Sequence, residues 1–367
     1  MSATDEDKQP ATGIAQQLFF DCERGEIQSA FDHPFRATQL YEAVYKRSID
    51  DFDRITNFPK SLRTELRARL DLRPLRIDRT FEASDGTRRH LIRLADGETI
   101  ETVFIPEGHR NTICVSSQVG CGLACAFCLT GQLGFGRHLT AGEIVAQVVA
   151  AQRENLPAGL RDHFNIVLMG MGEPLHNYDN VMKALRILHD AAGLNVSMSR
   201  ITLSTAGLVR ELERLAREPL LPNLAVSLTG ATNSKRDRLM PINRTYPIEE
   251  LIRVLGDFPL KAHQRVTLEY VLLEGVTDAA DDAYALARIA RKARAKVNLI
   301  PLNESSDLRF KRPDPATIAR FQDILTERGI RSFVRKSRGD DISAACGQLK
   351  RKWAETPPEI DLDALRI

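Results

Sequence analysis

The chain has 367 residues, of which 43% are apolar and 27% are charged, a composition typical of a globular protein with one large and one smaller domain. The net charge of +2 does not by itself indicate a nucleic-acid partner, and no segment reaches the ~18 apolar residues that a membrane helix needs. Residues 1–8 are polar and lack the apolar core of a signal peptide. With only six cysteines, the composition predicts a reduced, cytoplasmic protein without a membrane partner, with a monomer as the default state.

Changes in hydrophobic period divide the chain. Leu62, Leu66 and Leu70 recur at helical spacing, whereas Asp85-Gly86 and Asp96-Gly97 separate short β-type segments and favour tight hairpins. The expected segments are a flexible tail (1–12), a helical N-terminal accessory domain (13–75), a β-hairpin extension (76–108), a core (109–350) and a C-terminal tail (351–367).

From Thr112 onward, short apolar segments alternate with amphipathic helical patterns. The expected strands are 113–116, 166–169, 201–204, 224–227, 266–273, 297–300 and 332–336. The expected helices are 141–153, 181–191, 208–216, 248–255, 279–294 and 315–328. This succession predicts an α/β fold with a parallel sheet and outer helices, whose functional residues lie at the carboxyl ends of the strands.

Cys121, Cys125 and Cys128 form a C-x3-C-x2-C pattern in one short loop after the first core strand. Three thiols cannot all pair with one another, which argues against a disulfide framework. Zinc is an alternative, although structural zinc sites usually take four ligands, and inert cysteines are another. Three thiolates on a cubic 4Fe-4S cluster leave one iron without a protein ligand. The spacing therefore favours a cluster whose open iron holds a small molecule.

Polar residues follow several of the expected strands. Gly172 and Glu173 follow the second strand, Ser204 and Ser227 end the next two, and Asn303 follows the sixth. Each is common at a strand end, but together they predict a polar ring suited to ribose, adenine and a carboxylate. Cys114 and Cys346 are either small buried residues or further site residues. The glycines, Asp residues and basic residues around Cys346 favour the second interpretation.

These motifs, in this order, resemble the RlmN/Cfr family of radical S-adenosylmethionine (SAM) RNA methyltransferases, and most closely its RlmN type. The resemblance covers residues 33–350 and is strongest at 101–107, 114–128, 169–175 and 334–349. It implies a partial (βα)6 radical-SAM barrel with an N-terminal helical module and a small β-meander. It also implies one 4Fe-4S cluster on Cys121, Cys125 and Cys128, and two SAM molecules per turnover. The implied SAM contacts are Gly172, Glu173, Ser204, Ser227, Leu228, Thr229 and Asn303.

The family reaction methylates C2 of an adenosine in 23S rRNA, and RlmN-type members are expected also to modify adenosine 37 of some tRNAs. The resemblance implies that Cys346, on a C-terminal methyl-carrier loop, takes a methyl group from one SAM. A 5′-deoxyadenosyl radical from the second SAM then removes a hydrogen, and the carbon radical adds to adenine. Glu101 is the implied proton acceptor, and Cys114 the resolving thiol that forms a transient disulfide with Cys346. An electron donor such as flavodoxin is the implied reductant.

Two alternatives remain at this point. The same cysteines serve the Cfr-type reaction, which methylates C8 of the same 23S rRNA adenosine, so they do not fix the position of the methyl group. The second alternative is a non-catalytic, RNA-associated protein in which the cysteine loop binds zinc. One departure from the family pattern is Thr229, where the Ser-Leu-x segment usually has His.

Overall fold

The structure, a computed structural model, describes residues 17–29, 31–108, 111–157, 164–261, 264–345 and 347–349. The two expected tails, 1–12 and 351–367, lie outside the described residues. Within the described part of the chain, no helix has the length and apolarity needed to cross a membrane.

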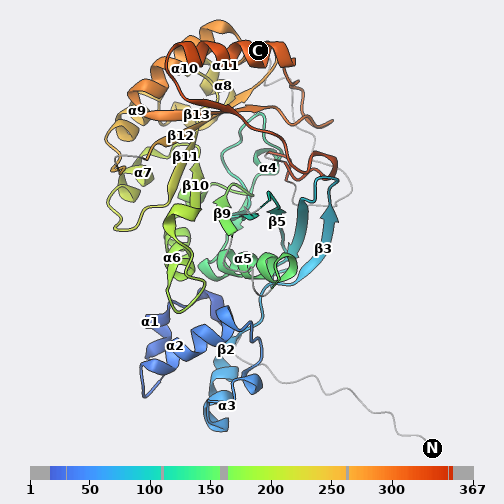
Figure 1. Cartoon of the computed structure of the whole chain (residues 1–367), viewed down its shortest axis with the longest axis vertical. Helices are drawn as coiled ribbons and strands as arrows, with labels where there is room; N and C mark the ends of the chain where they lie inside the picture. Colours follow the sequence, from blue (N-terminus) through green and yellow to red (C-terminus); the bar gives the residue numbers. More distant parts are fainter. Residues whose placement is uncertain are drawn as a thin grey trace, which may run out of the picture.

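A small helical module packs beneath the core, at the bottom of Figure 1. Its centre is aromatic, because Phe19, Phe20, Tyr41 and Tyr45 are all buried and their rings contact one another at 5.2–5.7 Å between centroids. Its elements are β1 (Gln17–Leu18), η1 (Phe19–Asp21), α1 (Arg24–Gln28), α2 (Phe35–Tyr41), η2 (Glu42–Lys46), η3 (Phe52–Arg54), α3 (Lys60–Arg69) and β2 (Leu70–Asp71).

Polar contacts join this module to the core. The Asp21 carboxylate accepts the Gly142 N–H at 2.6 Å, at the start of helix α5 (Ala141–Asn155). A side chain at Gly142 would lie 2.7 Å from the Asp21 nitrogen, so only glycine permits this approach. Arg153, in the last turn of α5, donates to the Val44 carbonyl at 2.8 Å. The module is therefore attached along the length of α5.

The core is one open sheet of ten strands in the order β14-β13-β12-β11-β10-β9-β6-β5-β4-β3. The strands from β14 to β6 run parallel, whereas β6, β5, β4 and β3 pair antiparallel, so the predicted β-meander continues the same sheet. Their bounds are β3 (Ile77–Glu82), β4 (Arg88–Arg93), β5 (Thr99–Ile105), β6 (Asn111–Cys114), β9 (Phe164–Leu168), β10 (Ile201–Thr205), β11 (Asn223–Ser227), β12 (Val266–Leu272), β13 (Ala295–Pro301) and β14 (Ser332–Val334).

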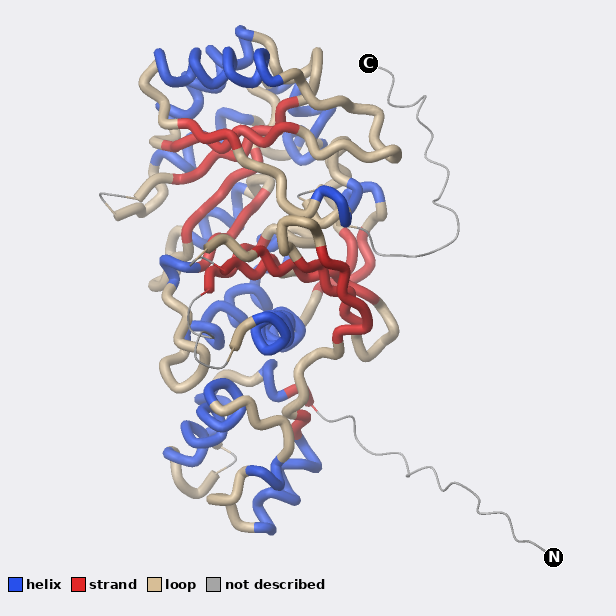
Figure 2. Tube along the Cα trace, turned by 45° about the vertical axis from the view of Figure 1, so that its right-hand side comes forward, coloured by secondary structure: helices blue, strands red, loops and turns tan. Residues whose placement is uncertain are grey.

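Helices follow the parallel strands and pack against the sheet, as the alternating pattern predicts. Figure 2 shows the strands as a continuous band with helices beside it, and α10 and α11 pack on β13 and β14. The remaining helices are α4 (Leu129–Gln132), α6 (Tyr178–His189), α7 (Val209–Leu215), α8 (Asn233–Leu239), α9 (Ile248–Gly256), α10 (Ala280–Lys292) and α11 (Pro315–Glu327), with the short turns η5 (Pro174–Asn177), η6 (Met198–Arg200), η7 (Pro241–Arg244) and η8 (Asp340–Ile342).

The strand register determines which polar residues share one face of the sheet. Paired residues share a face, as do residues two apart along a strand. Cys114 pairs with Val103, which is two residues from Glu101, and Ser227 pairs with Glu269. Followed from strand to strand, the register puts Glu101, Cys114, Ser204, Ser227 and Glu269 on the same face. The alternate residues of each strand face the helices.

Candidate functional site

The cysteine loop lies in the connection between two antiparallel strands, β7 (Gln118–Gly120) and β8 (Phe135–His138), which form a hairpin that the sequence did not predict. Cys121, Cys125 and Cys128 all line one cavity of about 170 Å³ beside the carboxyl ends of the parallel strands. The loop is fixed at its start, because the Cys121 N–H donates to the Gly134 carbonyl at 2.9 Å. Gly120, at φ 75°, has no room for a side chain against that same carbonyl oxygen.

The environment of these thiols fits an iron–sulfur cluster. Burial raises the pKa of Cys121 to about 12 and that of Cys125 well above its usual range, and a bound metal centre supplies the charge that removes such protons. Among the described residues, no three His, Cys, Asp or Glu side chains converge as they would around a single metal ion. A cubic cluster instead binds its ligands through separate irons. Three thiols on the wall of one cavity suit that arrangement.

Glu173 is the buried carboxylate of the cavity. It follows β9, and its side chain accepts the N–H groups of Leu175 at 3.0 Å and of Ala206 at 2.8 Å. It therefore connects the end of β9 to the end of β10. Burial raises the pKa of Glu173 to about 7, although these hydrogen bonds favour the carboxylate. A cationic ligand group in the cavity would favour the ionised form further.

Ser204 and Glu269 form a second polar pair in the cavity wall. The Ser204 hydroxyl donates to Glu269 Oε2 at 3.0 Å. Glu269 Oε1 is buried and has no hydrogen-bond partner among the described residues, but it forms an ion pair with Arg335 at 3.5 Å. A buried carboxylate oxygen without a hydrogen bond can accept one from a ligand donor. The sequence did not predict a role for Glu269, because a lone acidic residue within an apolar strand forms no local motif.

The Ser-Leu-Thr segment at the end of β11 contributes only its first side chain to the cavity. Ser227 is among the described lining residues, whereas Leu228 and Thr229 are not. Thr229 is fully buried, and its hydroxyl accepts the Val271 N–H at 3.2 Å. The hydroxyl of Thr229 therefore stabilises the neighbouring strand β12.

Asn303 also lines the cavity, and its Oδ1 accepts a hydrogen bond from the Ser337 hydroxyl. Cys346 lies outside the described residues. Its neighbour Gly347 lines the cavity and accepts the Leu129 N–H at 2.8 Å, at the start of helix α4. The segment 347–349 is therefore attached to the helix that follows the cysteine loop.

Glu101 and Cys114 lie on the same face of the sheet as Ser204, which is called the inner face below, but they do not line the cavity. Glu101 is buried and forms an ion pair with Arg89, whose guanidinium also lies 4.3 Å from the centre of the Phe81 ring. Cys114 is 8% exposed. The last cysteine, Cys22, lies in the N-terminal module, where burial raises its pKa to about 11.

Arg236, on helix α8, is a fully buried cation that the sequence did not predict. Its guanidinium donates to the carbonyls of Ala206 at 2.6 Å and Leu228 at 3.0 Å, and to the Asn243 side chain at 2.9 Å. It therefore joins the segments that follow β10 and β11, of which Ala206 lines the cavity. Burial lowers the pKa of Arg236 to about 10, and it remains a cation at neutral pH.

Comparisons with known proteins agree with this geometry. Residues 115–287 match the model of the radical SAM superfamily, and residues 26–72 match that of the ribosomal RNA large subunit methyltransferase N-terminal domain. The chain is 48% identical to a dual-specificity RNA methyltransferase RlmN of Syntrophotalea carbinolica, covering 88% of this chain and 86% of the relative. The RlmN of Geobacter sulfurreducens is also 48% identical, with 88% of each chain covered. The chain belongs to the RlmN family.

The solved structures support the same assignment. A radical SAM methyltransferase from Sphaerobacter thermophilus is 46% identical, with a TM-score of 0.87 over 91% of this chain and 99% of that one. The expected radical-SAM fold is confirmed, and the chain is a radical SAM enzyme of an RNA methyltransferase family, a group that uses a 4Fe-4S cluster and SAM.

The contacts of Arg236 predict a specific loss of stability. Replacing it with leucine leaves two buried carbonyls and an amide oxygen without a donor, so the free energy of unfolding should fall by about 3 kcal/mol. Thermal unfolding measures this as a lower midpoint. Arg238→Leu is the matched control, because Arg238 is exposed on the same helix. Equal midpoints for the two variants would show that Arg236 does not hold the strand ends together.

Proposed function

We propose that the protein methylates C2 of an adenosine in 23S rRNA, and adenosine 37 of some tRNAs, through a methyl group carried on Cys346. The observation that supports this most is the composition of one cavity. The three cysteines of the loop, Glu173, and three polar side chains from other strand ends, namely Ser204, Ser227 and Asn303, all line it. The RlmN relatives are named as dual-specificity RNA methyltransferases.

Within this proposal, each part of the cavity has a task. Cys121, Cys125 and Cys128 hold the cluster, and the Glu173 carboxylate receives the ammonium group of SAM. Ser204, Ser227 and Asn303 offer hydroxyl and amide groups to the rest of SAM. When bound, the cluster and a second SAM supply the radical that activates the methyl group on Cys346.

The remaining steps use residues on the inner face of the sheet. Carbon 2 of adenine has a C–H that ordinary methyl transfer does not activate, so the methyl carbon is joined to the ring before the ring proton leaves. Glu101, oriented by its ion pair with Arg89, accepts that proton. Once the adduct has also given up its unpaired electron, the Cys114 thiolate attacks the sulfur of Cys346. The carbon–sulfur bond breaks, the released carbon keeps the electron pair and takes up a proton to become the methyl group, and a disulfide forms between the two cysteines. An external donor such as flavodoxin supplies the electron for the radical step, and the disulfide is reduced before the next turnover.

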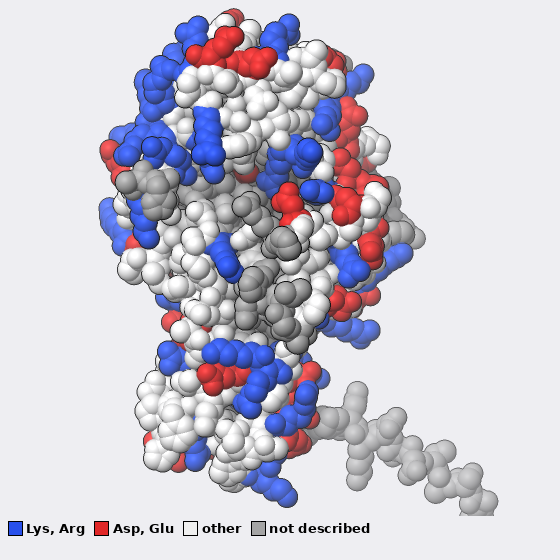
Figure 3. All heavy atoms as spheres, viewed as in Figure 1, with Lys and Arg blue, Asp and Glu red and all other residues white. Residues whose placement is uncertain are grey.

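Basic side chains do not form one continuous stripe on the face of the molecule drawn in Figure 3. Lys and Arg side chains are spread over the core and the N-terminal module there, and Asp and Glu lie among them. Phosphate contacts dominate the affinity of most RNA-binding proteins and weaken with salt. We infer that many dispersed contacts, from both parts of the chain, hold the RNA substrate.

The roles of the two distant cysteines predict different failures. Cys346→Ala should abolish methylation, because the methyl carrier is lost, whereas Cys114→Ala should accumulate a covalent protein–RNA adduct, because the resolving thiol is lost. Denaturing gels with labelled RNA detect the adduct. Cys22→Ala serves as the control, since Cys22 lies in the N-terminal module. Turnover by Cys346→Ala, or no adduct with Cys114→Ala, would contradict the proposed route.

The raised pKa of Glu173 predicts a pH-dependent affinity for SAM. Only the carboxylate attracts the ammonium group, and a pKa of about 7 means that this form decreases as the pH falls from 7 to 5.5. The dissociation constant of SAM for the cluster-loaded enzyme should then rise about tenfold over this range. Equilibrium dialysis measures it. Glu173→Gln should bind SAM weakly without this dependence; a flat profile for the unchanged enzyme would argue against Glu173 as the ammonium ligand.

A further inference from the structure

Gln118, on strand β7, lies directly behind the segment that carries Glu173. Its side chain is fully buried, and its Oε1 accepts the Glu173 N–H at 2.8 Å. The main-chain N–H of Gln118 donates to the Met171 carbonyl at 3.1 Å. A side chain at Gly172 would lie 2.6 Å from the Gln118 Cβ, so glycine is required for this close packing. The main-chain N–H and the side-chain amide of Gln118 together hold residues 171–173 against β7.

The other end of the same amide contacts two imidazoles. Gln118 Nε2 lies 3.0 Å from Nδ1 of His138 and 3.1 Å from Nδ1 of His176. The Glu173 N–H can only donate, so it fixes the amide oxygen on its side and turns the NH2 group toward the histidines. Both Nδ1 atoms must then accept. It follows that both histidines are neutral and carry their proton on Nε2.

The surroundings keep this pair in place. His138 pairs with Gln118 across the β7–β8 hairpin, His176 lies on η5, and their rings meet edge to face at 5.0 Å. Phe135 lies within 5.1 and 5.6 Å of the two rings. Burial lowers the pKa of His138, which favours its neutral form.

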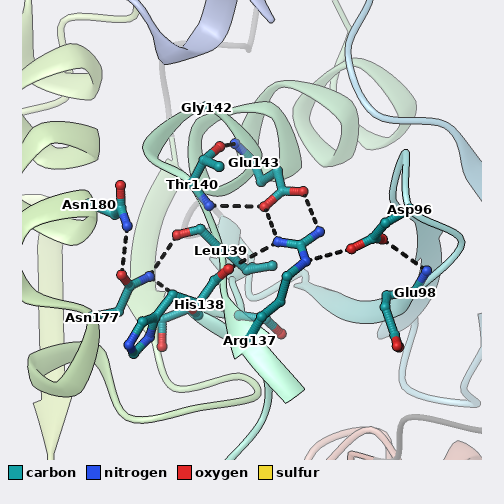
Figure 4. A network of polar contacts seen from close by, with 12 residues as sticks. Asp96, Glu98, Arg137, His138, Leu139, Thr140, Gly142, Glu143, Asn177 and Asn180 are labelled. Carbon is teal, nitrogen blue, oxygen red and sulfur yellow. Dashed lines mark hydrogen bonds and ion pairs between the residues drawn. The ribbon is translucent and has the colours of Figure 1, made fainter. Parts of the chain in front are cut away.

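The hairpin itself is anchored to the core, as Figure 4 shows. Arg137 donates to Asp96 at 2.6 Å and to both oxygens of Glu143 at 2.8 Å. Asn177 donates to the carbonyls of Ser117 at 2.8 Å and Leu139 at 2.7 Å. The β7–β8 hairpin that carries Gln118 is therefore fixed to the core, and Gln118 in turn contacts residues 171–173.

We propose that Gln118 is a positioning residue for SAM, whose amide, held by two neutral histidines, fixes the main chain at Glu173 and so aims its carboxylate into the cavity. Gln118 does not line the cavity itself, so it acts only through Glu173. This inference rests on the proposed binding of the SAM ammonium group by Glu173.

Replacing Gln118 with leucine tests this role. The change keeps the approximate size of the side chain but removes the acceptor for the Glu173 N–H and the donors to both histidines. We expect the dissociation constant of SAM, measured by calorimetry on the cluster-loaded full-length enzyme, to rise about tenfold. The cluster content should stay the same, because Gln118 contacts none of the three cysteines through a hydrogen bond that the structure describes.

Asn155→Leu is the matched control. Asn155 Nδ2 also donates to a histidine, His90 Nε2, at 2.8 Å, and its other partners are Arg88 and Ala151. None of these residues lines the cavity. This variant also loses an amide–imidazole hydrogen bond, at a partly buried position, but the affinity for SAM should not change. Equal weakening in both variants would reduce Gln118 to a structural residue and overturn the proposal.

A second measurement does not depend on SAM. Nitrogen-15 NMR of the histidine-labelled full-length enzyme with its cluster oxidised reports which ring nitrogen carries the proton. His138 and His176, assigned through His138→Gln and His176→Gln, should both be Nε2–H forms at pH 7.5. His90 should be the Nδ1–H form, since its Nε2 accepts from Asn155. A proton on Nδ1 of His138 or His176 would contradict the amide geometry.

The two proposals fail separately. If Glu173→Gln leaves the affinity for SAM unchanged, the ammonium assignment under the proposed function is wrong. If Glu173→Gln weakens binding and Gln118→Leu does not, only the positioning role of Gln118 is wrong.

Discussion

The buried carboxylate of Glu173 is the constraint on which the site depends. It accepts the main-chain N–H groups of Leu175 and Ala206, and so joins the ends of two neighbouring strands. Arg236 joins the next pair through the Ala206 and Leu228 carbonyls. A buried anion and a buried cation thus fix the spacing of the strand ends through main-chain hydrogen bonds, which hold their geometry regardless of which side chains follow.

Much of this architecture could be predicted from the sequence. The alternation of apolar segments and amphipathic helices from Thr112 onward indicated a parallel sheet with outer helices, and the family comparison confirms the radical-SAM fold. The cysteine spacing and the Gly-Glu-Pro segment are local motifs, so they predict chemistry without knowledge of the fold. The structure brings Cys121, Cys125, Cys128 and Glu173 to one cavity. The assigned roles of Glu101, Cys114 and Cys346 stay predictions.

Other residues could not be found in this way, because their importance depends on register and burial. Glu269 faces the cavity only because it pairs with Ser227 across β11 and β12. Arg236 resembles any arginine of a charged helix until the fold buries it completely. Gln118 links His138, His176 and Glu173, which are 20, 58 and 55 residues away from it in the chain. Such contacts form only when the hairpin β7–β8 folds against the strand ends.

The most direct test of the central claim is the identity of the modified nucleoside. Full-length, cluster-loaded enzyme would be incubated with 23S rRNA, SAM and a reductant, and the digested RNA analysed by mass spectrometry. The account predicts 2-methyladenosine that depends on both SAM and the reductant. The appearance of 8-methyladenosine instead, or no methylated adenosine from an enzyme that binds SAM and carries its cluster, would contradict it.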